Sequence, residues 1–266
     1  MKKFKTIVNE KIVCITISVL LFIPNILGVF SKNAAPESFT GQGVSEHFQP
    51  ELVSRISTVD DLLAEADFIA DSLRVDVKTL AYAEVLTHLV KNRFYHGYSH
   101  YAIHENWVAV LFGAYVWDHL SAIVIPDDIL KYPMAACSQQ SIVLAEGFKR
   151  KGLQYRKVGF DHHFALESKI DDQWYYFDPN LEPDFSAVQR KSLQSLVDEE
   201  ALYQIYQNKL DSSKLDWALS GVYFGATDES LAPRASFFHM VTKSLSIGGF
   251  LLPLLFLMIR IKVKSE

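Results

Sequence analysis

Three side chains near the middle of the chain have the types and the order that thiol catalysis needs. His163 follows Cys137 after 26 residues, and Asp178 lies 15 residues beyond His163. A cysteine attacks as the thiolate, which a neighbouring imidazolium favours. A carboxylate can hold the imidazole in the orientation and tautomer that accept a proton. We therefore expect a nucleophile, a general base and an orienting group, with His162 as the competing histidine.

A helix is expected to present Cys137. The segment after this residue has a polar first turn, and the apolar residues that follow recur at helical spacing, namely Ile142, Val143, Ala145 and Phe148. Gly152, after three basic residues, is typical of a helix end. Cys137 would then lie at or just before the positive end of the helix dipole, which favours a thiolate.

Extended segments are expected to present the other two residues. The residue types that favour strands gather in three segments, 153–160, 163–167 and 174–177. A turn is expected at 171–173, and Pro179 ends the last strand. Adjacent antiparallel strands would hold the imidazole of His163 and the carboxylate of Asp178 side by side.

These residues form a longer ordered motif. A cysteine and an apolar helix ending in glycine precede a strand, then H-x-x-x-E, then W-x-x-x-D-P. The residues of this motif are Cys137, Gly152, Arg156, His163, Glu167, Trp174, Asp178 and Pro179. The motif resembles the transglutaminase-like superfamily of papain-fold thiol enzymes. The resemblance implies an α+β fold with a helical lobe and an antiparallel sheet.

By position, the resemblance implies a role for each residue of the triad. Cys137 would be the nucleophile, His163 the general base and acid, and Asp178 the orienting residue. His163 fits the family spacing better than His162. The chain departs from the family at Ala165, where an aromatic residue often stands, and in the short segment before His163. Because of these departures, the substrate class of animal protein-crosslinking enzymes is not expected to apply. No acidic cluster indicates a calcium loop either.

An oxyanion donor is expected upstream of the nucleophile. The looser part of the resemblance includes Glu105, Asn106 and Trp107. Papain-like folds commonly use an upstream Trp or Gln side chain as the donor, in addition to the main-chain N–H of the nucleophile. Trp107 is the candidate and Trp117 its rival, while the alternative for both is a core aromatic on an apolar helix.

Both ends of the chain are apolar. Residues 12–30 form a 19-residue run without a charge, and residues 244–259 form a 16-residue run. A membrane span needs about 20 apolar residues, with a lower limit near 17. We expect two transmembrane helices. The alternatives are a cleaved signal peptide for the first run and a buried core helix for the second.

Charge is distributed unevenly between the ends and the middle. Residues 31–243 contain 19 Lys and Arg against 29 Asp and Glu, whereas the two flanks together have seven basic and two acidic residues. Basic residues gather on the cytoplasmic side of membranes. Both termini are therefore expected in the cytoplasm and the middle outside the cell membrane.

The expected organisation has four parts. These are an anchor or signal peptide over 1–30, a linker over 31–50, a transglutaminase-like domain over 51–236 and a C-terminal helix with a basic tail over 237–266. Cys14 lies in the first apolar run, which leaves Cys137 as the sole cysteine of the domain. An exported domain with one cysteine has no intramolecular disulfide partner for it, which favours a used thiol.

Further elements are expected around the motif. Thr58 and Asp61 predict a capped helix start. Helical spacing predicts additional helices in three segments, 76–95, 106–120 and 187–210. We expect the helices before Cys137 to pack around the helix that it begins, as a helical lobe. A short aromatic strand and loop are expected over 223–233.

The sequence gives no indication of a metal, a cofactor or a nucleic-acid partner. Four histidines, at 88, 96, 100 and 104, have no cysteine or carboxylate that completes a zinc pattern. We expect no metal and no cofactor. The negative middle of the chain argues against nucleic acid.

Two classes of function are consistent with these features. The first is a membrane-anchored, outward-facing hydrolase or acyl-transferase that acts on amide or ester bonds through a thioacyl intermediate. Its substrate would be a peptide, a protein or an envelope polymer. The second is a non-catalytic module of the same fold that assists a membrane or envelope assembly. The triad favours the enzyme.

Overall fold

The chain forms two compact units. The computed structural model describes residues 2–30, 47–207 and 211–265. The helical unit is made of the two ends of the chain and residues 100–123. The sheet unit contains the other described residues, including all three residues of the predicted triad. Residues 100–123, which fall inside the predicted domain 51–236, thus belong with the two ends.

The elements follow this division. The helical unit contains α1 (Lys2–Phe30), α5 (Ile103–Tyr115), a 3-10 turn η1 (Asp118–Leu120), α11 (Pro233–Gly248) and α12 (Leu251–Ser265). The helices of the sheet unit are α2 (Glu51–Arg55), α3 (Val59–Leu73), α4 (Leu80–Arg93), α6 (Pro126–Ile129), α7 (Cys137–Arg150), α8 (Leu193–Asp198), α9 (Leu202–Tyr206) and α10 (Ser212–Ala218). Its strands are β1 (Gln154–Gly159), β2 (Phe164–Ile170), β3 (Gln173–Phe177) and β4 (Tyr223–Thr227).

The sheet has the antiparallel arrangement that the sequence predicts. The strand order is β3-β2-β1-β4. Glu167 of β2 pairs with Arg156 of β1 on one side and with Tyr176 of β3 on the other. β2 is therefore a central strand, and it carries the residues after His163. The α+β class with an antiparallel sheet is confirmed.

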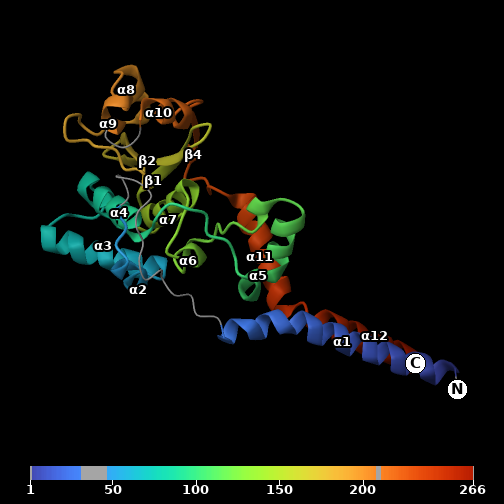
Figure 1. Cartoon of the computed structure of the whole chain (residues 1–266). Helices are drawn as coiled ribbons and strands as arrows, with labels where there is room; N and C mark the ends of the chain where they lie inside the picture. Colours follow the sequence, from blue (N-terminus) through green and yellow to red (C-terminus); the bar gives the residue numbers. More distant parts are fainter. Residues whose placement is uncertain (1, 31–46, 208–210, 266) are drawn as a thin grey trace. The chain divides into compact units, whose positions relative to one another are not determined.

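Helices cover both faces of this sheet. Figure 1 shows α7 against one face and α8, α9 and α10 over the other. The core between the sheet and α8–α10 contains buried residues from both layers, among them Val158, Ala165, Leu193 and Ile205. The burial of apolar surface on both faces of the sheet stabilises β2 and β3, the strands next to His163 and Asp178.

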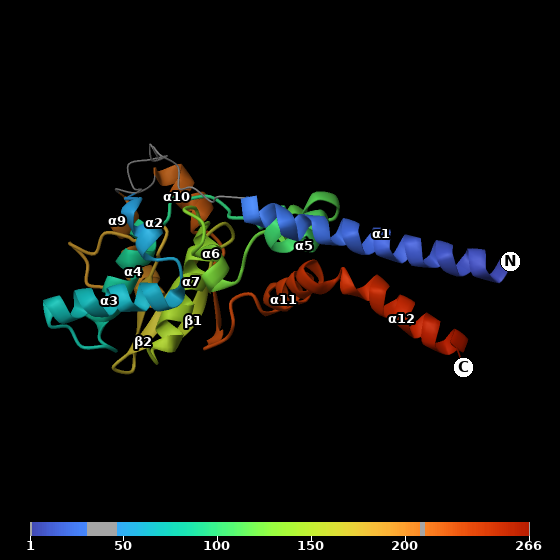
Figure 2. The ribbon, with the colours of Figure 1, turned by 90° about the horizontal axis from the view of Figure 1, so that it is seen from below.

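A helical layer supports α7 on the side away from the sheet. α3 and α4 pack on each other and on α7 (Figure 2). Thr58 Oγ1 caps α3 by accepting from the N–H of Asp61 at 3.1 Å, and the Asp61 carboxylate accepts from the N–H of Thr58 at 3.0 Å. The predicted capping box is thus confirmed. The predicted helix over 76–95 is shorter, because Thr79 caps α4 only before Leu80.

The predicted helix over 106–120 was wrong in its bounds and in its packing partner. α5 begins three residues earlier, and Asn106 inside it has a non-helical backbone (φ −158°, ψ 70°). α5 packs on α11 and α1 rather than with the helices that surround α7. The side chain of Asn106 is buried and donates to Thr242 Oγ1 of α11 at 2.9 Å. Buried hydrogen bonds to α11 therefore hold this segment in the helical unit.

The predicted helix over 187–210 is also wrong. Two short helices, α8 and α9, replace it, and residues 208–210 lie outside the described part of the chain. Ser192 caps α8 by accepting from the N–H of Ser195 at 3.2 Å. Glu200 between the helices has a positive φ of 55°, which a continuous helix does not allow. The apolar residues of the predicted face are nevertheless buried, including Leu196 and Tyr206.

The apolar ends are helical, but their membrane role stays a prediction. No single helix among the described residues is long and apolar enough to span a membrane, whereas α11 and α12 pass that test as a pair bent by 64°. α1 packs against α12, and the ring of Phe22 lies 4.9 Å from that of Phe250, in the turn just before α12. Most of the predicted linker, residues 31–46, lies outside the described residues.

Candidate active site

Cys137 is the first residue of α7, as the sequence predicts. Its side chain is partly exposed and forms no disulfide. Gln139 fixes the turn before the cysteine, because its Oε1 accepts from the N–H of Ala136 at 3.1 Å. The helix ends at Arg150, and Gly152 follows with a φ of +68°, a conformation that L side chains rarely adopt. The predicted helix start and helix end are both confirmed.

A hydrogen bond from α7 places His163 beside Cys137. Ser141 lies one helical turn after Cys137, and its Oγ donates to the carbonyl of Phe164 at 3.2 Å. Phe164 begins β2 and directly follows His163. The imidazole of His163 is 7% exposed and lies within hydrogen-bonding reach of the Cys137 sulfur. One helix and one strand therefore bring together two residues that are 26 positions apart.

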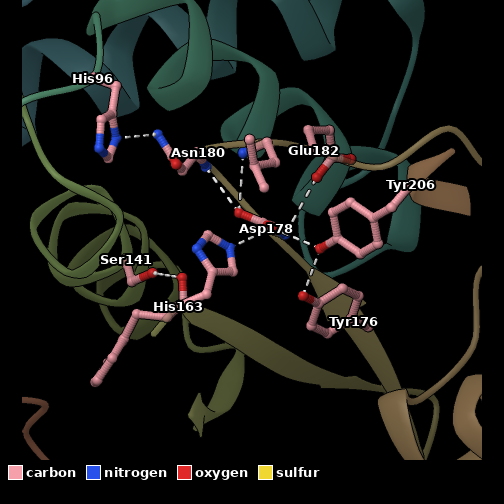
Figure 3. Close-up of polar contacts among 10 residues, drawn as sticks. His96, Ser141, His163, Tyr176, Asp178, Asn180, Glu182 and Tyr206 are labelled. Atoms are coloured by element: carbon pink, nitrogen blue, oxygen red, sulfur yellow. Dashed lines mark hydrogen bonds and ion pairs between the residues drawn. The ribbon is translucent and has the colours of Figure 1, made fainter. Parts of the chain in front are cut away.

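Asp178 completes the group from the end of β3. Its Oδ2 lies 2.6 Å from Nε2 of His163, and both side chains are buried. Figure 3 shows the imidazole between α7 and the carboxylate. An ionised carboxylate only accepts hydrogen bonds, so Nε2–H donates to it. In the neutral imidazole, Nδ1 is then the nitrogen that accepts a proton from the thiol.

Asp178 is held as an anion by four hydrogen bonds. Its Oδ1 accepts from the main-chain N–H groups of Asn180 and Leu181, each at 3.1 Å. Its Oδ2 accepts from the Tyr206 hydroxyl at 2.6 Å in addition to His163. Burial raises the pKa of Asp178, but the charge and hydrogen bond of His163, the Tyr206 hydroxyl and the Leu181 N–H outweigh burial and lower it.

The same contacts favour the charged imidazole. Burial lowers the pKa of His163, but the Asp178 carboxylate, and after it the Cys137 sulfur, outweigh burial and raise the pKa to about 10. The ordinary value is 6.5. At neutral pH this arrangement favours an imidazolium, the partner that stabilises a thiolate.

No protein-family model, curated protein or solved structure matches this chain.

Sequence reasoning missed two tyrosines behind the triad. Tyr206 comes from α9 and Tyr176 from β3, and their hydroxyls lie 2.7 Å apart in the buried core (Figure 3). Tyr206 already donates to Asp178, so its oxygen accepts from Tyr176. The only signal in the sequence is that Tyr206 falls on the apolar face of the predicted helix over 187–210.

A second buried group, also missed, supports the backbone of Asp178. The Asp178 N–H donates to the carboxylate of Glu182 at 3.3 Å. Arg190 pairs with Glu182, and its Nη1 donates to the carbonyl of Tyr176 at 2.7 Å. Arg190 therefore contacts both Tyr176, within β3, and Glu182, in the loop after this strand. These two contacts fix the direction of the Asp178 side chain.

Three other residues of the sequence motif contact one another. Arg156 donates from Nε to the Glu167 carboxylate at 2.6 Å, and its guanidinium lies 4.4 Å from the ring centroid of Trp174. Glu167 is fully buried and also accepts from the main-chain N–H of Leu193 at 2.6 Å. These residues connect β1, β2, β3 and the start of α8. None of them is a member of the predicted triad.

The competing candidates make other contacts. The ring of His162 stacks on Trp217 at 4.2 Å, with the planes within 5°. Trp107 and Trp117 belong to the helical unit. The indole N–H of Trp107 donates to the carbonyl of Ser246 at 3.2 Å, so within that unit it already has an acceptor. The geometry therefore gives no support to Trp107 as an oxyanion donor.

A pocket of about 380 Å³ opens elsewhere in the sheet unit. Its lining includes Trp174, Arg190, Lys191 and Ser192, but none of the triad residues. Arg190 and Lys191 are both paired with carboxylates. Among the described residues, no cluster of His, Cys, Asp and Glu has the arrangement of a metal site.

Proposed function

We propose that this protein is a cysteine-dependent hydrolase or acyl-transferase with a transglutaminase-like domain. The observation that carries the proposal is the series of contacts from the partly exposed Cys137 through the buried His163 to the buried Asp178. The 2.6 Å contact between His163 and Asp178 and the raised pKa of His163 support a thiolate and imidazolium pair. A binding module has no need for a partly exposed thiol beside a buried imidazole and carboxylate.

The reaction would begin when the Cys137 thiolate attacks the carbonyl carbon of an amide or ester. The new C–S bond sends the carbonyl electron pair to oxygen. As the tetrahedral intermediate collapses, the imidazolium of His163 gives its proton to the leaving amine or alcohol. Water, or a second amine, then attacks the thioacyl carbon, with neutral His163 accepting the proton, and the thiolate leaves. Asp178 keeps Nε2–H oriented throughout.

We further propose that the domain is anchored in the cell membrane and faces outward, with both termini in the cytoplasm. The apolar composition of α1 and α12 and the basic flanks support this topology. Several large apolar side chains of these helices are exposed, including Leu20 at 59% and Met258 at 66%. Its substrate would be a peptide, protein or envelope polymer near the membrane.

The test is the rate of iodoacetamide labelling of Cys137 across pH 4 to 9. The detergent-solubilised full chain is used in a Cys14→Ser background, so that only one thiol reacts. An ion pair predicts labelling well below the free-thiol pKa of about 8.5 in the wild-type site, and loss of that low-pH reactivity in His163→Ala. If both proteins react with an ordinary thiol profile, the enzyme proposal fails and the binding module leads.

A further inference from the structure

Three side chains gather at the end of the sheet that carries His163. Phe164 of β2 pairs with Gly159 of β1, and Gly159 pairs with Tyr223 of β4, so these positions form one row across the sheet. Lys157 lies two residues from Gly159 on the same strand. Because side chains alternate between the two faces of a strand, Lys157 shares a face with this row. We call Lys157, Phe164 and Tyr223 the Lys157 cluster.

The ammonium group of Lys157 lies close to two aromatic rings. Its Nζ is 4.9 Å from the ring centroid of Phe164 and 4.8 Å from that of Tyr223. Both distances fall within the range of about 6 Å over which a ring attracts a cation. The two rings therefore hold one positive charge at a defined place on the sheet.

Two glycines make room for this cluster. A Cβ at Gly159 would lie 1.8 Å from a ring carbon of Tyr223, and a Cβ at Gly225 would lie 3.0 Å from the Cβ of Lys157. The ring of Tyr223 thus packs directly on the main chain of β1. Tyr223 is nevertheless 44% exposed, and Lys157 and Phe164 are partly exposed. The cluster is therefore packed in place and open to a ligand.

Phe164 connects the cluster to the nucleophile. This residue directly follows His163, whose imidazole lies within hydrogen-bonding reach of the Cys137 sulfur. The carbonyl of Phe164 accepts from Ser141 Oγ at 3.2 Å, and Ser141 lies one turn of α7 after Cys137. Lys157 contacts the ring of this same Phe164. The cluster therefore begins at the residue next to the general base.

The cluster also lies on the face of the sheet that α7 covers. Leu166 of β2 is opposite Lys157 on one side and Phe177 on the other, so these three side chains share a face. The rings of Phe177 and Phe148 of α7 lie 5.5 Å apart on that face. A substrate that reaches the partly exposed Cys137 at the start of α7 can therefore extend over the neighbouring part of the same face.

Lys157 differs from the other basic residues of its sheet. Arg156 and Lys169 are paired with Glu167 and Asp172. Among the residues that the structure describes, no carboxylate pairs with Lys157. A single ammonium beside one phenol offers few donors, which suits the two oxygens of a carboxylate better than the three oxygens of a phosphate. The charge and the donors thus match a carboxylate.

We propose that the Lys157 cluster is a substrate subsite that binds the side chain of Asp or Glu in a peptide, close to the bond that Cys137 attacks. This inference rests on the proposed function and narrows its substrate class to acidic peptides. The ammonium of Lys157 pairs with the carboxylate, and the two rings contact the apolar part of the same side chain. Residues 31–243 are net negative, so this local positive charge also orients an acidic substrate on the domain.

The test compares charged and neutral reagents that alkylate Cys137 in the full chain with Cys14→Ser. Iodoacetyl-Glu-amide and iodoacetyl-Gln-amide differ only in a carboxylate against an amide, and the thiolate displaces iodide from both. A second pair has a glycine between the iodoacetyl group and Glu or Gln. Mass spectrometry measures the rates at neutral pH, where the neutral reagent is the internal reference.

We expect the Glu reagent of at least one pair to react faster than its Gln counterpart in the wild-type site. Lys157→Gln should lower this Glu-to-Gln rate ratio by about threefold to fivefold, the upper range for a partly exposed ion pair. Lys157→Arg keeps the charge and should retain most of the preference. A lysine that serves only to pack against the rings would leave the ratio unchanged.

Lys78→Gln is the matched control, because it removes the same charge at the opposite end of α7. Its Nζ would lie 3.3 Å from a Cβ at Gly152, just beyond the end of this helix. The rate ratio should not change in this variant. A second measurement needs no variant: at about 1 M salt the Debye length is about 3 Å, so the preference of the wild-type site should shrink.

The assignment is overturned if Lys157→Gln lowers the ratio for neither pair of reagents, or if Lys78→Gln lowers it as much. A wild-type ratio that does not respond to salt overturns it as well. Loss of the low-pH iodoacetamide reactivity in the wild-type site would instead show that the proposed function has failed. Because an ordinary thiol also alkylates at higher pH, the rate ratio can still be measured there, and the two failures are distinguishable.

Discussion

At the scale of single residues, the oxygen Oδ2 of Asp178 serves two donors. His163 and the Tyr206 hydroxyl both lie 2.6 Å from it. When two donors share one carboxylate oxygen, each donor interacts with less of its negative charge. Tyr206 therefore stabilises the Asp178 anion and at the same time weakens its pull on the imidazolium. This makes Tyr206 a positioning residue that sets the basicity of His163.

Tyr206→Phe should raise the pKa of His163. With one donor fewer, Asp178 interacts more strongly with the imidazolium, and a hydrogen bond of about 1 kcal/mol corresponds to a shift of up to about one unit. NMR titration of the His163 ring in a common Cys137→Ala background measures the shift. Tyr176→Phe is the control, because it leaves both donors on Asp178. An unchanged or lowered pKa in Tyr206→Phe contradicts this account.

The paired charges also predict how stability depends on pH. The lowered pKa of Asp178 means that its contribution is present above its ordinary value of 3.8 and is lost as pH falls through the folded value. The raised pKa of His163 means that its contribution is complete below 6.5 and is lost as pH rises through about 10.

Wild-type protein should therefore exceed Asp178→Asn in free energy of unfolding most clearly between about pH 4 and 6.5. The difference should shrink on both sides of this window. Urea titrations of both proteins from pH 3 to 10 measure it. A difference that does not vary with pH would mean that packing, rather than charge, accounts for the role of Asp178.

At the scale of elements, Arg190 positions the end of β3. Arg190 is 6% exposed and pairs with Glu182, which accepts from the N–H of Asp178. Its guanidinium also lies over the ring of Phe177, at 4.7 Å from the centroid. Removing this arginine leaves Glu182 as a buried charge without its partner and frees the loop that follows β3.

Arg190→Met should destabilise the protein by about 3–5 kcal/mol, the usual cost of breaking a buried ion pair. The matched control is Lys191→Met, which removes the exposed pair with Glu199 and should cost less than about 1 kcal/mol. Urea unfolding at neutral pH measures both. Equal effects in the two variants would show that the buried pair contributes no more than a surface pair.

The elements that the sequence predicted well are those with strong local signals. The start of α7, the capping box of α3 and the three strands around the triad depend on residues within one or two turns or one strand. The segment 187–210 failed because its apolar spacing is compatible with one helix or with two. Glu200 adopts a positive φ so that α9 can turn back and place Tyr206 against Asp178.

At the scale of the whole molecule, residues 100–123 form an insertion whose two ends meet. His100 and Ala122 form an antiparallel bridge, and the N–H of Tyr101 donates to the carbonyl of Ser121 at 3.0 Å. Between these ends, α5 packs on α11 and α1. The insertion thus interrupts the sheet unit, and its two ends are close enough for a short turn to connect them.

A shortened protein that lacks residues 1–46 and 233–266, with Gly-Gly in place of 101–121, should fold and stay soluble. Two residues are enough to connect adjacent antiparallel ends. Its Cys137 should show the same pH profile of iodoacetamide labelling as Cys137 of the full chain. The control keeps 101–121 and should aggregate, because α5 then exposes the face that packs on α11. Aggregation of the Gly-Gly form alone would show that the sheet unit needs the helical unit to fold.

The sequence by itself determined the order of the triad, the helix that presents Cys137 and the strands that present its partners. Each of these follows from periodicity, capping and turn residues, which act between near neighbours in the chain. The tertiary structure decided which side chains surround the triad. Tyr206 reaches Asp178 across 28 residues and His96 reaches Asn180 across 84. The tertiary structure also decided that α5 packs with the two ends of the chain. Such contacts depend on how whole layers pack and how buried polar groups find partners, and no local pattern encodes that.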